Sequence, residues 1–181
     1  MPRTLVIDAC CTLNLLATRR EVDIAEALDL LLLDTPQVAR QAQMLWTPPD
    51  ADGNRGKEPA SSAKLRKSRR LDTRRLDGQE LTDAFVRAAE QIDDADASCI
   101  ALAGVLELPL FTDDRKARRI AQSMFSEIEL VSTLDVLAEA AKKLKWSADE
   151  LSKVALDLYW RGSFAPPRND PRREWYAKLV A

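Results

Sequence analysis

Residues 93–121, DDADASCIALAGVLELPLFTDDRKARRIA, carry the strongest signal for the fold. Asp93 and Asp94 are typical helix caps, and the alanine-rich run behind them has the apolar spacing of a helix. The run PLFT at 109–112 is typical of a strand, and the pair Asp113-Asp114 ends it before another helix begins. A helix, a strand and a helix in this order are typical of an α/β domain.

The rest of the chain alternates between strand-like and helix-like segments in the same way. Short β-rich runs occur at 4–7 and 128–131, and no Asn-Gly hairpin signal separates two strands. We therefore expect a three-layer α/β/α domain with a mostly parallel central sheet. The expected helices lie at 13–17, 21–33, 38–46, 81–92, 97–104 and 117–124. The helix at 81–92 follows the sequence DGQE at 77–80, which has the spacing of a capping box. Two further helices begin at Ser132/Asp135 and Ser147/Glu150, and the second of them ends at Gly162.

The length of 181 residues is typical of one domain. We interpret residues 1–145 as the main domain, and residues 146–181 as a C-terminal helix and a proline- and arginine-rich tail packed on it, anchored by Trp175 and Tyr176. Residues 47–76 are interpreted as an exposed, mobile loop, because prolines, glycines and charges replace the apolar pattern. Between residues 55 and 75 the sequence contains nine Lys and Arg but only two acidic residues, which gives this loop a local charge of +7.

Composition excludes several kinds of site. Histidine is absent, so Ser-His-Asp catalysis, Cys-His catalysis and imidazole-ligated zinc are excluded. The five glycines form no GxGxxG or GxxxxGK[ST] loop. Cys10, Cys11 and Cys99 form no CxxC pair and lie in apolar runs, so we expect buried, reduced thiols. The sequence shows no signal peptide and no uncharged stretch long enough to cross a bilayer, which predicts a cytoplasmic protein.

Aspartates follow two of the expected strands. Asp8 ends the first strand and Asp113-Asp114 end a later one, while Asp96 lies in the first turn of the helix between them. Single aspartates at such positions are usually helix caps. Because the carboxyl ends of parallel strands meet at one edge of a sheet, however, we expect Asp8, Asp96 and Asp114 to converge there. Converging carboxylates stay ionised together only with cations between them, and oxygen-only ligands favour Mg²⁺ or Mn²⁺.

Two segments resemble the PIN-domain family. LVIDACCTLNLLA, at 5–17, is similar to the opening strand, aspartate and helix of a PIN domain. Residues 93–121 are similar to its second half: an acid before an alanine, an alanine-rich helix, a strand and the motif T-x-D. The resemblance implies a fold over residues 4–145 and a metal-dependent ribonuclease. Its catalytic and metal-binding acids would be Asp8, Asp96 and Asp114, and Asp113 would be an additional metal ligand.

The resemblance also implies which residues support this site. Thr112 lies beside the strand-end acids, and Asn14 occupies a polar position on the first helix that often borders the site in the family. The glutamate that the family usually places three residues after the valine of a V-P-x-x-V-like helix is replaced, because TPQVARQ has Gln41 at that position. An amide can still offer a carbonyl oxygen to a cation, but it brings no charge. Alternatively, Gln41 faces solvent and another acid, such as Glu58 or Glu80, completes the site.

The leading hypothesis is an endoribonuclease that uses Mg²⁺ or Mn²⁺. The alternatives are a PIN-fold module that binds RNA or protein without cleaving, and an unrelated acidic-pocket α/β protein of the phosphatase or receiver type. Because many bacterial PIN domains are toxins of toxin–antitoxin pairs, the resemblance suggests an antitoxin-like partner and a homodimer. The basic loop has three interpretations: a solvated linker, a docking site for an acidic partner, or an arm that contacts RNA phosphates. Its expected RNA-binding residues are Lys64, Arg66, Lys67, Arg69 and Arg70.

Overall fold

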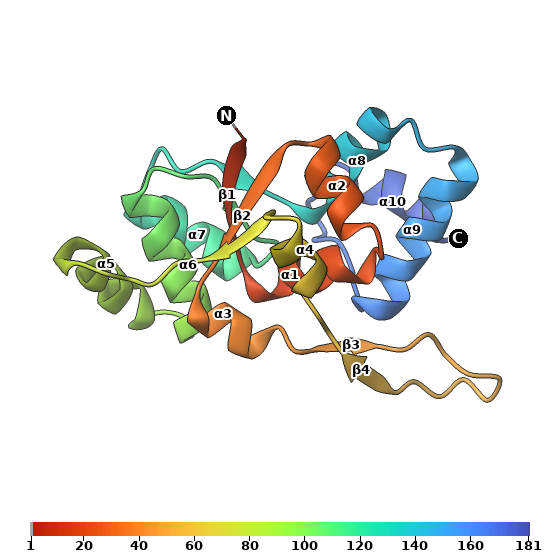
Figure 1. The fold of residues 1–181 in the computed structure, drawn as a ribbon, viewed down its shortest axis with the longest axis horizontal. Helices are drawn as coiled ribbons and strands as arrows, with labels where there is room; N and C mark the ends of the chain where they lie inside the picture. The colour runs from red at the N-terminus through yellow and green to blue at the C-terminus, as the bar shows by residue number, and fades with distance from the viewer. Residues whose placement is uncertain (1) are drawn as a thin grey trace.

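A computed structural model describes residues 2–181 and places a parallel sheet of five strands at the centre of the molecule (Figure 1). The strand order is β5-β2-β1-β6-β7, and every pair of neighbouring strands is parallel. This arrangement confirms the predicted α/β fold with its mostly parallel sheet. The strands are β1 (Arg3–Ile7), β2 (Leu30–Asp34), β5 (Leu71–Thr73), β6 (Leu110–Phe111) and β7 (Leu130–Val131).

Helices cover both faces of the sheet, because the side chains of each strand point alternately to opposite faces. Leu5 and Ile7 of β1 belong to the core shared with α1, α2, α8, α9 and α10, whereas Val6 belongs to the core shared with α3, α5, α6 and α7. No helix in residues 2–181 is long and apolar enough to cross a membrane. The helices are α1 (Ala9–Ala17), α2 (Glu21–Ala27), α3 (Pro36–Gln41), α4 (Ala63–Lys67), α5 (Gln79–Ala89), α6 (Asp94–Val105), α7 (Arg115–Met124), α8 (Thr133–Leu144), α9 (Ala148–Arg161) and α10 (Arg173–Val180).

The helix predicted at 21–33 is only partly correct. Helix α2 ends at Ala27, and the run LLLLD at 30–34 forms β2, which lies between β1 and β5. A strand covered on both faces has a continuous apolar sequence, and this pattern cannot be distinguished from a buried helix by periodicity. Asp29, in the left-handed backbone region with φ +47°, forms the turn between the two elements.

The helix predicted at 38–46 and the mobile loop predicted at 47–76 are also corrected. Helix α3 ends at Gln41, and β3 (Met44–Trp46) pairs with β4 (Lys57–Pro59) as an antiparallel hairpin that projects from the body of the molecule (Figure 1). The chain then forms α4 and the edge strand β5. Arg55 lies over the rings of Trp46 and Trp160, 5.0 and 5.6 Å from their centroids, and so fixes the hairpin to α9.

Helix boundaries agree well with the predicted caps. Ser132 and Ser147 form the expected capping boxes with Asp135 and Glu150, and Gly162 ends α9. The spacing DGQE does not form a capping box, because Gly78 is the N-cap of α5 and no side chain caps the helix. Of the two tail aromatics, Tyr176 is 2% exposed and donates to the carbonyl of Ala155 across 3.1 Å, while Trp175 is partly buried on the same core.

Candidate active site

The sheet brings the first two strand-end aspartate positions together. Strands β1 and β6 are direct neighbours, with Val6 opposite Leu110 and Ile7 opposite Phe111. One residue further on, the amide of Asp8 donates to the carbonyl of Phe111 across 3.2 Å. Asp8 therefore lies beside the turn that contains Thr112, Asp113 and Asp114, at the carboxyl edge of the sheet where parallel folds place their sites.

Asp8 is a buried carboxylate with one unpartnered oxygen. Its side chain is 2% exposed, and Oδ1 accepts a 2.6 Å hydrogen bond from the amide of Cys11 as the N-cap of α1. Oδ2 is also buried and has no hydrogen-bond partner within residues 2–181. Burial raises the pKa of Asp8 to about 6. The Thr112 hydroxyl, which lies near the carboxylate without the geometry of a hydrogen bond, and the Cys11 amide limit the rise, and the charge of Asp113 adds to it. An unpartnered buried oxygen is costly, so a functional reason for it is expected.

Asp96 lies close enough to Asp8 and to Asp114 for both charges to act on it. Burial raises the pKa of Asp96 to about 7, and the negative charges of Asp8, Asp93 and Asp114 add to the effect. Asp96 lies in the first turn of α6, and Asp114 is the exposed N-cap of α7, where its Oδ1 accepts from the amide of Ala117 across 2.7 Å. We call Asp8, Asp96 and Asp114 the carboxylate group.

Cys10 lies beside the carboxylate group. Its thiol is free and exposed, which corrects the prediction that all three cysteines are buried; Cys11 and Cys99 are buried and free. Burial of its atoms, together with the charges of Asp8, Asp96, Asp114 and Asp113, raises the pKa of Cys10 to about 12. The pKa of this one thiol is therefore affected by all four aspartates that the sequence analysis identified as site candidates.

Asp113 has a different environment from the carboxylate group. Its Oδ2 accepts from the hydroxyl of Thr133 across 2.5 Å and from Asn14 Nδ2 across 3.1 Å, and its Oδ1 accepts from the amide of Thr133 across 2.9 Å. Both oxygens are thus used to join α1, the turn after β6 and the start of α8. Asn14 and Thr133 are buried, so this network fixes the turn that carries Asp114. Thr112 contributes by accepting from the amide of Asp114 across 3.1 Å.

Gln41, at the position where the family usually has a glutamate, lies at the edge of this arrangement. Gln41 is the last residue of α3, is exposed, and lines a cavity of about 530 Å³ together with Asp93 and Asp94 at the start of α6. The two alternative acids lie elsewhere. Glu58 forms a 2.5 Å ion pair with Arg161, and Glu80 lies exposed in the first turn of α5. Neither is among the charges that raise the pKa of Asp8 or Asp96.

The basic residues of the former loop divide into two sets. Arg66 and Arg70 form ion pairs with Asp34 and Asp29, at 2.7 and 2.9 Å. Lys64, Lys67 and Arg69 are exposed, and the only ion pair that residues 2–181 offer to any of them is a 4.0 Å contact from Lys64 to Glu21.

Sequence reasoning missed one strand-end acid, Asp34. It follows β2 as Asp8 follows β1, and its side chain is 2% exposed. Its two oxygens accept from Thr73 Oγ1 at 2.6 Å and from Arg66 at 2.7 Å. Burial nevertheless raises its pKa. Four leucines before an aspartate are the available signal, but a continuous apolar run of this kind is equally typical of a buried helix.

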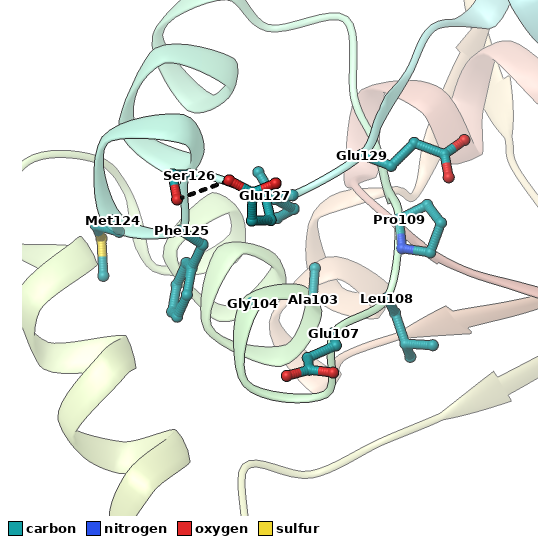
Figure 2. Close-up of a pocket in the computed structure, with 11 residues that line it drawn as sticks. Ala103, Gly104, Glu107, Leu108, Pro109, Met124, Phe125, Ser126, Glu127 and Glu129 are labelled. Atoms are coloured by element: carbon teal, nitrogen blue, oxygen red, sulfur yellow. Dashed lines mark hydrogen bonds between the residues drawn. The ribbon is translucent and has the colours of Figure 1, made fainter.

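A cavity of about 720 Å³ at the opposite end of the sheet is separate from the carboxylate group. Figure 2 shows its lining, which includes Glu107, Pro109 and Glu129 from the segments that precede β6 and β7. These segments lie at the amino ends of the strands. On one wall Phe125 packs against Gly104, where a Cβ atom would lie 2.2 Å from the ring.

The oxygen donors of the carboxylate group are the type of ligand that a hard divalent cation prefers, but they do not form a closed site in this structure. They are oxygens, and one of them is the unpartnered Oδ2 of Asp8. No three Cys, Asp or Glu side chains in residues 2–181 are close enough together to form a ready metal site. Side-chain rotation of the exposed Asp114 and the half-buried Asp96 would be needed to bring their oxygens onto one ion.

Comparison with known proteins identifies the family. Neither the curated proteins nor the solved structures gave a match to the chain. A family model described as a PIN domain matches residues 51–162, which is more than half of the chain. The matched range contains Asp96, Thr112, Asp113 and Asp114, whereas Asp8 precedes it. The chain belongs to the PIN-domain family.

Proposed function

We propose that the protein is an endoribonuclease that hydrolyses RNA phosphodiester bonds with Mg²⁺ or Mn²⁺ bound at the carboxylate group. PIN-domain membership supports a nuclease. The observation that carries the proposal is the buried, unpartnered Oδ2 of Asp8, combined with the effect that the charges of Asp8 and Asp114 both have on the pKa of Asp96. Asp8, Asp96 and Asp114 would hold the cation.

The chain's own residues have separate roles in this proposal. The amide of Cys11 fixes one oxygen of Asp8 and leaves the other for the cation. Asp113, Asn14 and Thr133 hold the turn after β6, so that Asp114 stays at the sheet edge. When bound, a divalent cation supplies an activated water molecule and stabilises the charge that develops on the phosphodiester.

The basic segment supplies the proposed RNA contacts outside the cleavage site. Lys64, Lys67 and Arg69 are exposed and suited to sequence-independent phosphate contacts. Arg66 and Arg70, also expected from the sequence to bind RNA, are engaged with Asp34 and Asp29, and we assign them mainly to holding α4 and β5.

Cleavage of a panel of structured RNAs tests the proposal. Wild type is expected to cleave with Mg²⁺ or Mn²⁺ and to stop with EDTA. Asp8→Asn, Asp96→Asn and Asp114→Asn should each lower kcat/KM by roughly 10²-fold or more, because each removes a cation ligand. Asp94→Asn removes the same charge from the first turn of α6 without being part of the carboxylate group, and it should retain activity. Unchanged cleavage by Asp114→Asn would refute the assignment.

A second candidate is a PIN-fold module that binds RNA without cleaving it. The specific observation in its favour is that no closed three-ligand metal site exists among residues 2–181, together with an amide at position 41. This function predicts RNA binding that is unchanged in Asp8→Asn, and no cleavage at millimolar Mn²⁺. The same panel therefore distinguishes the two candidates.

A further inference from the structure

A cavity with several arginines in its wall adjoins the carboxylate group. It has a volume of about 380 Å³ and lies between α7, the start of α8 and the segment 167–172 that precedes α10. Asp113 forms part of its wall, and the next residue, Asp114, belongs to the carboxylate group. We call this feature the arginine cavity.

The arginines reach the cavity from two sides. Arg115, Arg118 and Arg119 come from one face of α7, at the spacing i, i+3 and i+4 that brings helix side chains together. Arg172 comes from the C-terminal segment on the other side. Four guanidinium groups from two distant parts of the chain therefore line one small cavity.

Only part of this positive charge is used by the fold. Arg118 donates to the carbonyl of Thr112 across 2.7 Å, and Arg172 pairs with Asp135. The wall also contains three acids, so its arginines exceed its acids by one: Asp135 pairs with Arg172, while Asp113 and Asp170 keep their charge and accept hydrogen bonds from neutral donors. Arg115 and Arg119 are exposed, and within residues 2–181 their side chains have no ion-pair or hydrogen-bond partner.

Two unpaired guanidinium groups beside one cavity indicate an anionic ligand. Guanidinium groups repel each other, and their planar fork matches the oxygens of a phosphate group. An RNA strand at the carboxylate group must also overcome repulsion from three aspartates, and nearby positive charge offsets it. We infer that the arginine cavity binds one phosphate group of the RNA strand, next to the bond that is cleaved. This inference rests on the proposed ribonuclease function.

RNA binding by paired charge variants tests the inference. Arg115→Gln/Arg119→Gln removes the two unpaired charges, and Lys116→Gln/Lys143→Gln removes two exposed charges from α7 and α8 that do not line the cavity. The dissociation constant of a short single-stranded RNA is measured in EDTA at several salt concentrations. The arginine variant should bind about tenfold more weakly, with a salt slope smaller by about 0.7, the value for one phosphate contact on a single strand. The lysine variant should change much less.

A neutral methylphosphonate placed in turn at each linkage of the same RNA locates the contact. In the wild type, one linkage should weaken binding when it is neutralised, and in the arginine variant that linkage should no longer matter. Equal affinities and equal slopes in the two variants would overturn the inference. Because binding is measured without metal, a wild type that binds in this pattern but does not cleave contradicts only the ribonuclease. A wild type that cleaves while both variants bind equally contradicts only the arginine cavity.

Discussion

Asp8 is the residue on which the candidate site depends most. It is nearly fully buried, it keeps one oxygen without a partner, and its pKa is raised to about 6. A purely structural N-cap would not need such an environment, because the N-caps Asp93, Ser132 and Ser147 of other helices lie nearer the surface or are fully hydrogen-bonded. The buried, unpaired oxygen is more consistent with a ligand than with a cap alone.

The raised pKa of Asp8 predicts a stability effect of known sign. Because its pKa is about 6 in the folded protein and 3.8 ordinarily, the folded state binds more protons between these values, and stability falls as pH rises through the window. Asp8→Asn cannot ionise. In EDTA, its free energy of unfolding should therefore gain about 2.5 kcal/mol on wild type between pH 4 and pH 7. Urea unfolding at several pH values measures this, with Asp94→Asn as the control; a pH-independent difference would contradict the prediction.

The reactivity of the Cys10 thiol provides a test of the surrounding charges that needs no metal. Its pKa of about 12 results from burial and then from the neighbouring aspartates. Asp96→Asn removes one of these charges, so it should lower the pKa of Cys10 and increase the rate of alkylation by iodoacetamide at pH 8.5 severalfold. Cys11 and Cys99 are buried and should not react in the folded protein. Asp94→Asn should leave the rate unchanged, and an equal rate in Asp96→Asn would show that residues 96 and 10 are not neighbours.

At the scale of elements, sequence patterns identified amphipathic helices and failed at central strands. Helices α6 and α7, and the capping boxes of α8 and α9, follow from caps and apolar spacing. Strand β2 does not, because burial on both faces removes the alternation that marks a strand. Strand β5 is three residues long within a charged segment, and only its pairing with β2 makes it a strand. Neither property is local to the sequence.

The Arg66–Asp34 ion pair is expected to hold α4 and β5 on the sheet. Asp34 is 2% exposed, so removal of the cation leaves a buried charge with only the Thr73 hydroxyl as a partner. Arg66→Gln should lower the free energy of unfolding by about 2 kcal/mol, less than for a fully buried pair because the arginine is half-exposed. Lys67→Gln, on the same helix and without an ion pair among residues 2–181, should change it by less than about 0.5 kcal/mol. Chemical denaturation measures both effects, and equal effects would show that the Arg66–Asp34 ion pair does not stabilise the fold.

Gln41 tests whether the end of α3 belongs to the site. Gln41→Glu places a carboxylate beside Asp93 and Asp94, in the cavity that lies at the start of α6. The added charge should tighten Mn²⁺ binding severalfold, and it should slightly lower the stability of the metal-free protein through like-charge repulsion. Calorimetric titration of Mn²⁺ into the two proteins measures the effect. Equal affinities would place position 41 outside the site.

At the scale of the whole molecule, the candidate site follows from the sheet topology. Because β1 and β6 are parallel neighbours, Asp8 lies beside the end of the strand that leads to Asp114, although more than a hundred residues separate the two. Sequence reasoning could predict this placement from the position of each acid after a strand. It could not predict that Asp113 would be occupied by Asn14 and Thr133, or that the tail would bring Arg172 to α7, since both depend on how distant segments pack.

A crystal soaked in Mn²⁺ tests the central claim most directly. Anomalous scattering locates the ion without any assumption about the reaction. We predict an anomalous peak at the carboxylate group, with Asp8 Oδ2 among its ligands and with Asp96 and Asp114 rotated toward it. The peak should be absent from an Asp8→Asn crystal soaked in the same way. A well-ordered wild-type crystal with no peak at this edge of the sheet at millimolar Mn²⁺ would contradict the account.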